Sequence, residues 1–82
     1  MNKYYPLYEY LVKCKKDTVI SFDEINKIIG DELPRSAYIY PEWWSNAKDG
    51  SHQHCRNWVE AGFCTQDVAV NIAVEKMLFV KI

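Results

Sequence analysis

Three tryptophans, Trp43, Trp44 and Trp58, lie within 16 residues of one another in a chain of only 82 residues. Tryptophan is costly to expose, and each buried aromatic ring removes about 150–250 Å² from water. A domain of this size buries only about 60% of the surface of its unfolded chain, so its core is thin. The segment from 35 to 63 is therefore either the organising core of the protein or its binding surface.

The composition is that of an ordinary globular domain. Hydrophobic residues make up 49% of the chain and charged residues 26%, which excludes a disordered protein. No apolar run approaches the about 20 residues of a membrane span, and residues 1–6 show no hydrophobic signal region. We expect one cytoplasmic domain over residues 1–82. The odd number of cysteines, three, favours reduced thiols over a disulfide framework.

Local signals predict the first three elements. Pro6 suits the first turn of a helix, and the apolar residues that follow recur at three- and four-residue spacing. The β-branched run 18–20 predicts a short strand. Ser21 and Glu24 form a capping box, and Gly30 is a typical C-terminal stop, so a second helix is predicted between them.

The middle of the chain is less regular. Residues 35–40 are compatible with a short helix or with an extended segment, and residues 43–50 are expected to form a loop with turn residues. Ser51 is expected to cap a third helix from about 52 to 61, with Gly62 as its stop.

The C-terminal part alternates between apolar and other residues. This alternation over 68–74 and 78–82 predicts a β-hairpin with its turn somewhere in 71–76. The whole order predicts a small α+β, winged-helix-like domain with three helices, a short strand and a C-terminal β-hairpin. In a winged helix-turn-helix the short strand joins the hairpin in one antiparallel sheet, and the third helix usually enters a DNA major groove.

The chain carries no motif that indicates an enzyme or a metal site. His52, His54 and Cys55 lie within four consecutive positions, where one helix cannot direct all three side chains at a tetrahedral zinc ion. Neither Cys55 nor Cys64 lies in a recognisable nucleophile motif. We therefore expect no enzymatic activity, no cofactor and no metal.

The third helix and the loop before it carry side chains suited to DNA. Gln53, Arg56 and Asn57 are expected on the outward face of the helix, where Gln and Asn can read base edges and Arg can bind phosphate. Trp43 or Trp44 can stack on an unpaired base. The further predicted contacts are Arg35 and Lys48 on phosphate, Asn46 on bases, and Ser45 and His52 near the start of the helix.

A structural interpretation of the same residues stays open. Helical spacing favours Trp58 in the core, and the adjacent Trp43 and Trp44 are expected to point one inward and one outward. Asn46 would then bond to the backbone and shape the loop. The net charge of −1 also argues against a generic polyanion binder.

Several short motifs run along most of the chain: Tyr5-Pro6-Leu7-Tyr8-Glu9-Tyr10-Leu11, Ser21-Phe22 with Glu24-Ile25 and Gly30, Leu33-Pro34 with Ser36-Ala37, Trp43-Trp44-Ser45-Asn46, His52, and Trp58 with Ala61-Gly62-Phe63. Together they resemble a widespread family of small, uncharacterised bacterial and phage domains. The family pattern tends to have Gln and Ala where this chain has His54 and Cys55, and Trp where it has Phe63. The resemblance implies a DNA-associated module of bacteria or mobile elements and no particular activity.

The leading hypothesis is therefore a non-enzymatic DNA-binding module. The alternative is a protein-interaction module, such as a phage-encoded inhibitor of a host nuclease or of a CRISPR-type defence complex, because aromatic residues and Arg are common in interface hot spots. A homodimer that pairs through the hairpin edge or the exposed Trp43 is a third possibility. Salt dependence separates binding to DNA phosphates from an aromatic protein interface.

Overall fold

The computed structural model describes residues 2–47 and 53–82. In this part of the chain the elements are α1 (Tyr5–Val12), β1 (Thr18–Ser21), α2 (Phe22–Ile29), α3 (Arg35–Ile39), the 3₁₀ turns η1 (Pro41–Trp44) and η2 (Gln53–Cys55), α4 (Arg56–Val59), β2 (Phe63–Gln66), α5 (Val68–Ala73) and β3 (Lys76–Lys81). The protein is therefore an α+β domain.

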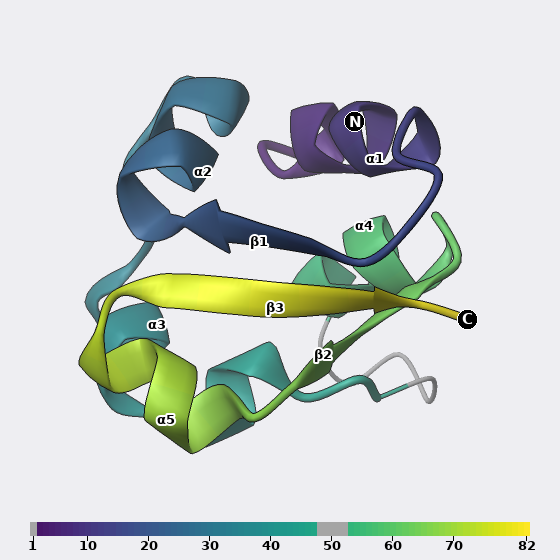
Figure 1. Cartoon of the computed structure of the whole chain (residues 1–82). Helices are drawn as coiled ribbons and strands as arrows, with labels where there is room; N and C mark the ends of the chain where they lie inside the picture. The colour runs from purple at the N-terminus through teal and green to yellow at the C-terminus, as the bar shows by residue number, and fades with distance from the viewer. Residues whose placement is uncertain (1, 48–52) are drawn as a thin grey trace.

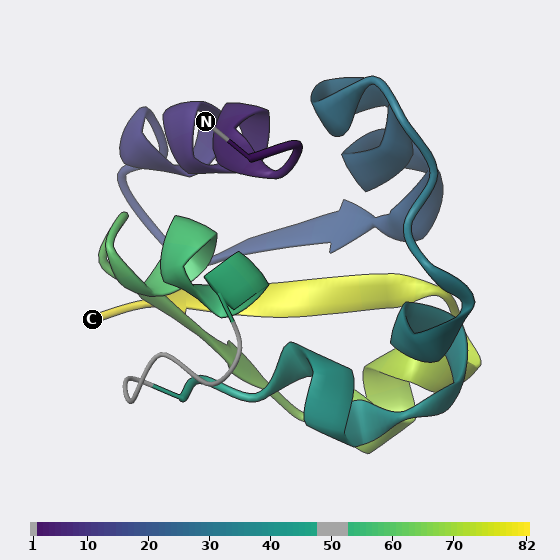
Figure 2. The same cartoon turned by 180° about the vertical axis from the view of Figure 1, so that it is seen from behind.

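The three strands form one antiparallel sheet in the order β1-β3-β2 (Figure 1). The long β3 lies between the two short strands, so β1 and β2 are both edge strands. The views from the front and from behind show α4 at the end of the sheet where β3 finishes, while α3 and α5 lie at the end where β3 begins (Figures 1 and 2). Features placed on α4 and on α3 or α5 are therefore at opposite ends of the molecule.

An aromatic stack fills the space on the inner face of the sheet. Trp44 lies between Phe22, at a ring-centroid distance of 5.1 Å, and Trp58, at 5.7 Å. Phe79 on β3 closes the stack with edge contacts to both tryptophans. All four rings are buried. The tryptophan segment is therefore mainly the core of the protein, and the core position expected for Trp58 is confirmed.

The N-terminal half agrees with the predictions from local signals. The α1 helix begins around Pro6, and the short strand β1 pairs with β3. The hydroxyl of Ser21 accepts a hydrogen bond from the N–H of Glu24 at 3.0 Å, as a helix cap does. Gly30 ends α2 with a φ of 70°, in the left-handed region that glycine adopts without strain.

The predicted C-terminal hairpin is wrong. Residues 63–66 form β2, residues 68–73 form the helix α5, and only the second expected strand exists, as β3. The segment 68–74 is apolar at almost every position. Its larger residues therefore alternate as in a strand, although the segment is a helix. Asp67 and Glu75, with φ values of 53° and 54°, interrupt the extended chain on both sides of α5.

The other helices also differ in part from the predictions. Residues 35–39 form a helix, α3, rather than an extended segment, and the 3₁₀ turn η1, over 41–44, includes the first two residues of the expected loop. The third helix predicted over 52–61 is shorter, because η2 and α4 together span only 53–59. Its predicted cap, Ser51, lies outside the described residues. No helix in the described part of the chain is long and apolar enough to cross a membrane.

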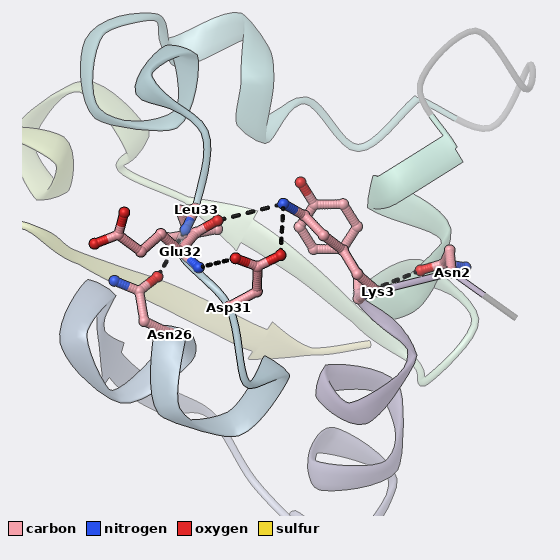
Figure 3. Close-up of polar contacts among 7 residues, drawn as sticks. Asn2, Lys3, Asn26, Asp31, Glu32 and Leu33 are labelled. Atoms are coloured by element: carbon pink, nitrogen blue, oxygen red, sulfur yellow. Dashed lines mark hydrogen bonds and ion pairs between the residues drawn. The ribbon is translucent and has the colours of Figure 1, made fainter.

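The N-terminal segment bonds to the turn between α2 and α3 (Figure 3). The ammonium of Lys3 lies 3.5 Å from the Asp31 carboxylate and 3.3 Å from the carbonyl of Glu32. The side-chain carbonyl of Asn26 accepts the N–H of Leu33 at 2.8 Å. These contacts link three segments that are separate in the sequence, so the turn has a defined shape.

The Asp31 contacts predict an acid sensitivity. The Glu32 N–H at 2.7 Å, and then the charge of Lys3, lower the pKa of the Asp31 carboxyl below its ordinary value of 3.8. The folded state therefore favours the carboxylate form of Asp31. This contribution to the free energy of unfolding is complete above about pH 4, and it is lost as the pH falls through the lower pKa of the folded state. Urea unfolding at stepped pH values should show the stability difference between wild type and Asp31→Asn shrinking below pH 3.8.

Lys3→Ala is the matched comparison. It removes the charge of Lys3 and keeps the hydrogen bond from the Glu32 N–H, so part of the pH dependence of stability should remain. A stability difference between wild type and Asp31→Asn that stays constant down to pH 2 would contradict the assignment.

Candidate nucleic-acid interface

Asn46 joins the tryptophan segment to the sheet. The backbone N–H of Thr65 donates to Asn46 Oδ1 at 2.9 Å, and Asn46 Nδ2 donates back to the Thr65 carbonyl at 3.1 Å. The indole N–H of Trp58 donates to the same Oδ1 at 2.9 Å. A side-chain amide therefore pairs with the edge of β2 in place of a neighbouring strand. Its polar atoms bond inside the fold, as the structural interpretation expected.

The adjacent Trp43 and Trp44 point one outward and one inward, as predicted. Trp44 is fully buried, and its indole N–H donates to the Ala37 carbonyl at 2.8 Å. Trp43 is half-buried and lies flat against His54, with ring centroids 4.0 Å apart and planes 10° apart. The edge of Tyr4 closes on the same ring at 5.8 Å, and burial raises the pKa of the Tyr4 hydroxyl above its ordinary 10.0. One face of Trp43 is therefore already covered by protein.

The other predicted contacts do not gather on one surface. Arg35 begins α3, at the end of the sheet opposite to α4, which carries Arg56 (Figures 1 and 2). Ser45 is half-buried after η1. Lys48, His52 and the side chain of Gln53 lie outside the described part of the chain. The structure therefore separates Arg35 from the rest of the predicted interface.

Within α4, the structure corrects one orientation. Arg56 is exposed as predicted, and Glu60 is also exposed, but Asn57 is only 5% exposed. Its Nδ2 donates to the His54 carbonyl at 2.9 Å and to Asn2 Oδ1 at 3.2 Å. Cys55, Trp58 and Ala61 face the core at ordinary helical spacing. Asn57 is buried in addition because the N-terminal segment and α1 pack against α4 on that side.

A polar groove of about 340 Å³ lies between α1 and α4. Its lining residues are Asn2, Tyr5, Tyr8, Arg56, Asn57 and Glu60. The rings of Tyr5 and Tyr8 lie together on its α1 side, with centroids 5.4 Å apart and planes 30° apart. The groove thus combines two half-buried aromatic rings with a guanidinium group and two side-chain amides.

The guanidinium of Arg56 is available to an external anion. In the described part of the chain its ion-pair partner is Glu60, one turn later, at 3.4 Å, and both side chains are about 60% exposed. Exposed pairs of this kind contribute only about 0.3–0.5 kcal/mol. A bound phosphate can therefore replace the Glu60 carboxylate at little cost.

Basic residues surround this end of the molecule. The connection from α1 to β1 carries Lys13, Lys15 and Lys16, all exposed. The same connection meets the end of β3, because Asp17 accepts the N–H of Lys81 at 2.8 Å. The end of β3 in turn bonds to the chain after α4, where the Gly62 carbonyl accepts the N–H of Ile82 at 2.8 Å. These lysines and Arg56 therefore belong to one end of the fold.

Sequence reasoning missed the contribution of α1 to this site. Tyr5 and Tyr8 are three residues apart, outside the buried stripe of Leu7 and Leu11, and that spacing is the available signal. Their proximity to Arg56 depends on the packing of α1 against α4, about which a local motif carries no information.

The described residues give no support for a metal or disulfide site. No three His, Cys, Asp or Glu side chains among them lie together as metal ligands would. Cys55 is buried, Cys14 and Cys64 are half-buried, and none of the three forms a disulfide. Cys55 Sγ donates to the Ala47 carbonyl at 2.9 Å, which agrees with the packing role expected for reduced thiols.

The fold and the groove define a small α+β domain with a shallow polar surface between two helices. The chain belongs to the family described as Domain of unknown function (DUF7662), whose model matches residues 4–80. This agrees with the resemblance to an uncharacterised domain family. No curated protein and no solved structure matches the chain.

Asn46→Ala should be strongly destabilising. It leaves the Trp58 indole N–H and the Thr65 N–H without their acceptor, and each such loss costs about 1–3 kcal/mol. We expect the free energy of unfolding to fall by about 3 kcal/mol in urea titrations followed by tryptophan fluorescence. Gln66→Ala, at the exposed neighbouring position of β2, is the control and should change it by less than about 0.5 kcal/mol. Equal effects of the two changes would contradict this role for Asn46.

Proposed function

We propose that the domain is a non-enzymatic module that binds nucleic acid, with an unpaired base in the groove between α1 and α4. One observation carries the proposal: the groove brings the Arg56 guanidinium together with the Tyr5 and Tyr8 rings. Aromatic rings that stack on bases, next to cations that bind the backbone, are the common features of proteins that bind single strands.

The tyrosines suit stacking better than the tryptophans do. Tyr5 and Tyr8 are half-buried and line an open groove, whereas Trp44 and Trp58 are buried and one face of Trp43 is against His54. Stacking of one base on an aromatic side chain contributes about 1–3 kcal/mol. The exposed Asn2 beside the rings can offer a hydrogen bond to the edge of a bound base, whereas the buried Asn57 amide already bonds within the fold.

The distribution of charge supports a polyanion at this end, although the net charge is −1. Exposed Lys13, Lys15 and Lys16 of the α1–β1 connection, and Lys81 at the end of β3, lie at the end of the sheet that carries α4. Asp23 and Glu24 at the start of α2, and Asp67 and Glu75 on either side of α5, lie at the other end, while Glu60 and Asp17 lie near the basic residues. The excess of lysines around the α1–β1 connection favours the approach of a polyanion from that side.

The arrangement of strands supports a winged-helix-like interpretation in part. The short β1 pairs with β3, and α4 precedes the two remaining strands of the sheet, where the major-groove helix of a winged helix-turn-helix stands. However, α4 has only four residues, and Asn57 points inward. These limits favour unpaired bases over the major groove of a duplex.

Fluorescence anisotropy with labelled single-stranded and duplex DNA of mixed sequence tests the proposal at several salt concentrations. We expect the single strand to bind more tightly, with affinity that falls as salt rises. Arg56→Ala should raise the Kd about tenfold, the effect of one charge-assisted hydrogen bond. It should also reduce the salt slope by about 0.7. Tyr5→Leu should raise the Kd by a similar factor without changing the slope.

Arg35→Ala is the matched control, because Arg35 is an exposed arginine at the opposite end of the sheet. It should leave the affinity unchanged. Thermal unfolding of each variant checks that the fold is retained. Absence of binding at low salt would overturn the proposal in favour of a protein-interaction module, and an equal loss in Arg35→Ala and Arg56→Ala would overturn the assignment of the groove.

A further inference from the structure

The helix α5 presents an apolar face that the described part of the chain does not cover. None of its six residues is fully buried, and five of the six are Val, Ile or Ala. Val70 is 72% exposed and Val74, which ends the helix, is 57% exposed. A helix that is apolar on all sides is normally enclosed on all sides, so α5 has the character of an element that packs against something further.

The outward face of α5 is apolar throughout. Val68 and Ile72 face the core, while the exposed positions are Ala69, Val70, Ala73 and Val74. At 100° per residue these four fall on one side of the helix. The single polar residue, Asn71, turns its amide to the backbone, where Nδ2 donates to the carbonyls of Asp67 at 2.9 Å and Gln66 at 3.2 Å.

The backbone at both ends of α5 is fixed to the rest of the fold. The Asn71 bonds close its N-terminal end onto β2. At the other end the Glu75 N–H donates to the Ile72 carbonyl at 3.0 Å, and the Glu75 carbonyl accepts the N–H of Phe22 at 2.9 Å. The face is therefore presented on a rigid support, which reduces the entropic cost of binding through it.

The face is complementary to itself. A two-fold axis that crosses the exposed face between residues 71 and 72 sets Ala69 against Val74 of a second copy, and Val70 against Ala73. Each larger side chain thus meets a smaller one, as the interdigitation of two helices requires. A closed two-fold contact of this kind uses the same patch on both subunits.

The charges at the two ends of the helix follow the same symmetry. Asp67 precedes α5, and Glu75 and Lys76 follow it, and all three are exposed. In the antiparallel arrangement Asp67 of one copy lies opposite Lys76 of the other at both ends of the contact, while Glu75 lies opposite Val68, which packs against the core. A parallel arrangement would instead set like charges together, which is unfavourable.

We propose that α5 is the interface through which two copies of this chain associate, antiparallel and about a two-fold axis that crosses its exposed face between residues 71 and 72. Stable interfaces bury about 800 Å² on each partner, and one face of a six-residue helix supplies only part of that area. The dimer is therefore weak, and its population rises with protein concentration.

Sedimentation velocity over a wide concentration series tests the proposal. The wild type should shift from monomer to dimer as concentration rises. Val70→Lys should remain monomeric, since it sets a charge in the centre of the contact. Val19→Lys is the matched control: Val19 is an exposed valine on β1, and its replacement should leave the dimer unchanged. A monomeric wild type, or a dimer that persists in Val70→Lys, would overturn the proposal.

A charge exchange tests the antiparallel orientation. Asp67→Lys and Lys76→Glu should each raise the dimer Kd about tenfold, because each converts two symmetry-related attractions into repulsions. The double variant restores opposite charges and should recover the wild-type Kd. Asp67→Asn removes the charge, and asparagine tolerates the left-handed backbone at φ 53°. It should raise the dimer Kd by a smaller factor, which separates the effect of charge from that of backbone strain. Failure of the double variant to recover, with Asp67→Asn unaffected, would overturn the antiparallel pairing.

Discussion

The paired hydrogen bonds between the Asn46 amide and the Thr65 backbone are the contact on which the C-terminal half of the fold depends. They close the outer edge of β2 and provide the acceptor for the buried indole of Trp58. Thr65 also bonds to the tryptophan segment through its side chain, since its hydroxyl donates to the Trp44 carbonyl at 2.6 Å. An unpaired strand edge and a buried indole N–H would each be unfavourable, so one side chain stabilises both the sheet and the aromatic core.

This use of the tryptophan segment determines where function can lie. Trp44 and Trp58 build the core, Trp43 covers it together with His54, and Asn46 closes the sheet. Such a small domain has little other apolar material with which to enclose a core. The surface that we propose for binding is therefore formed by other residues, above all the α1 tyrosines beside Arg56.

The parts of the fold that the sequence predicts correctly are those with local causes. The capped α2 follows from Ser21 and Gly30, whose side-chain and backbone requirements are met within a few residues. No local signal of this kind defines the α5 segment. Its run of apolar residues is compatible with a strand or a helix, and the turns at its two ends decide between them. The groove joins Tyr5 to Arg56 across about fifty residues, and the burial of Asn57 depends on the N-terminal segment that packs against α4. Both are consequences of packing, and no local pattern reports packing.

The two proposed surfaces lie at opposite ends of the molecule, which makes them independent and also compatible. Association through α5 leaves the groove of each copy uncovered, because α4 stands at the far end of β3 from α5. A dimer about the α5 axis then carries two grooves that face away from each other. A nucleic acid long enough to reach both would bind with an effective concentration set by its own length, whereas a short one would bind each groove separately. Weak association through α5 would thus convert a shallow, modest site into a bivalent one.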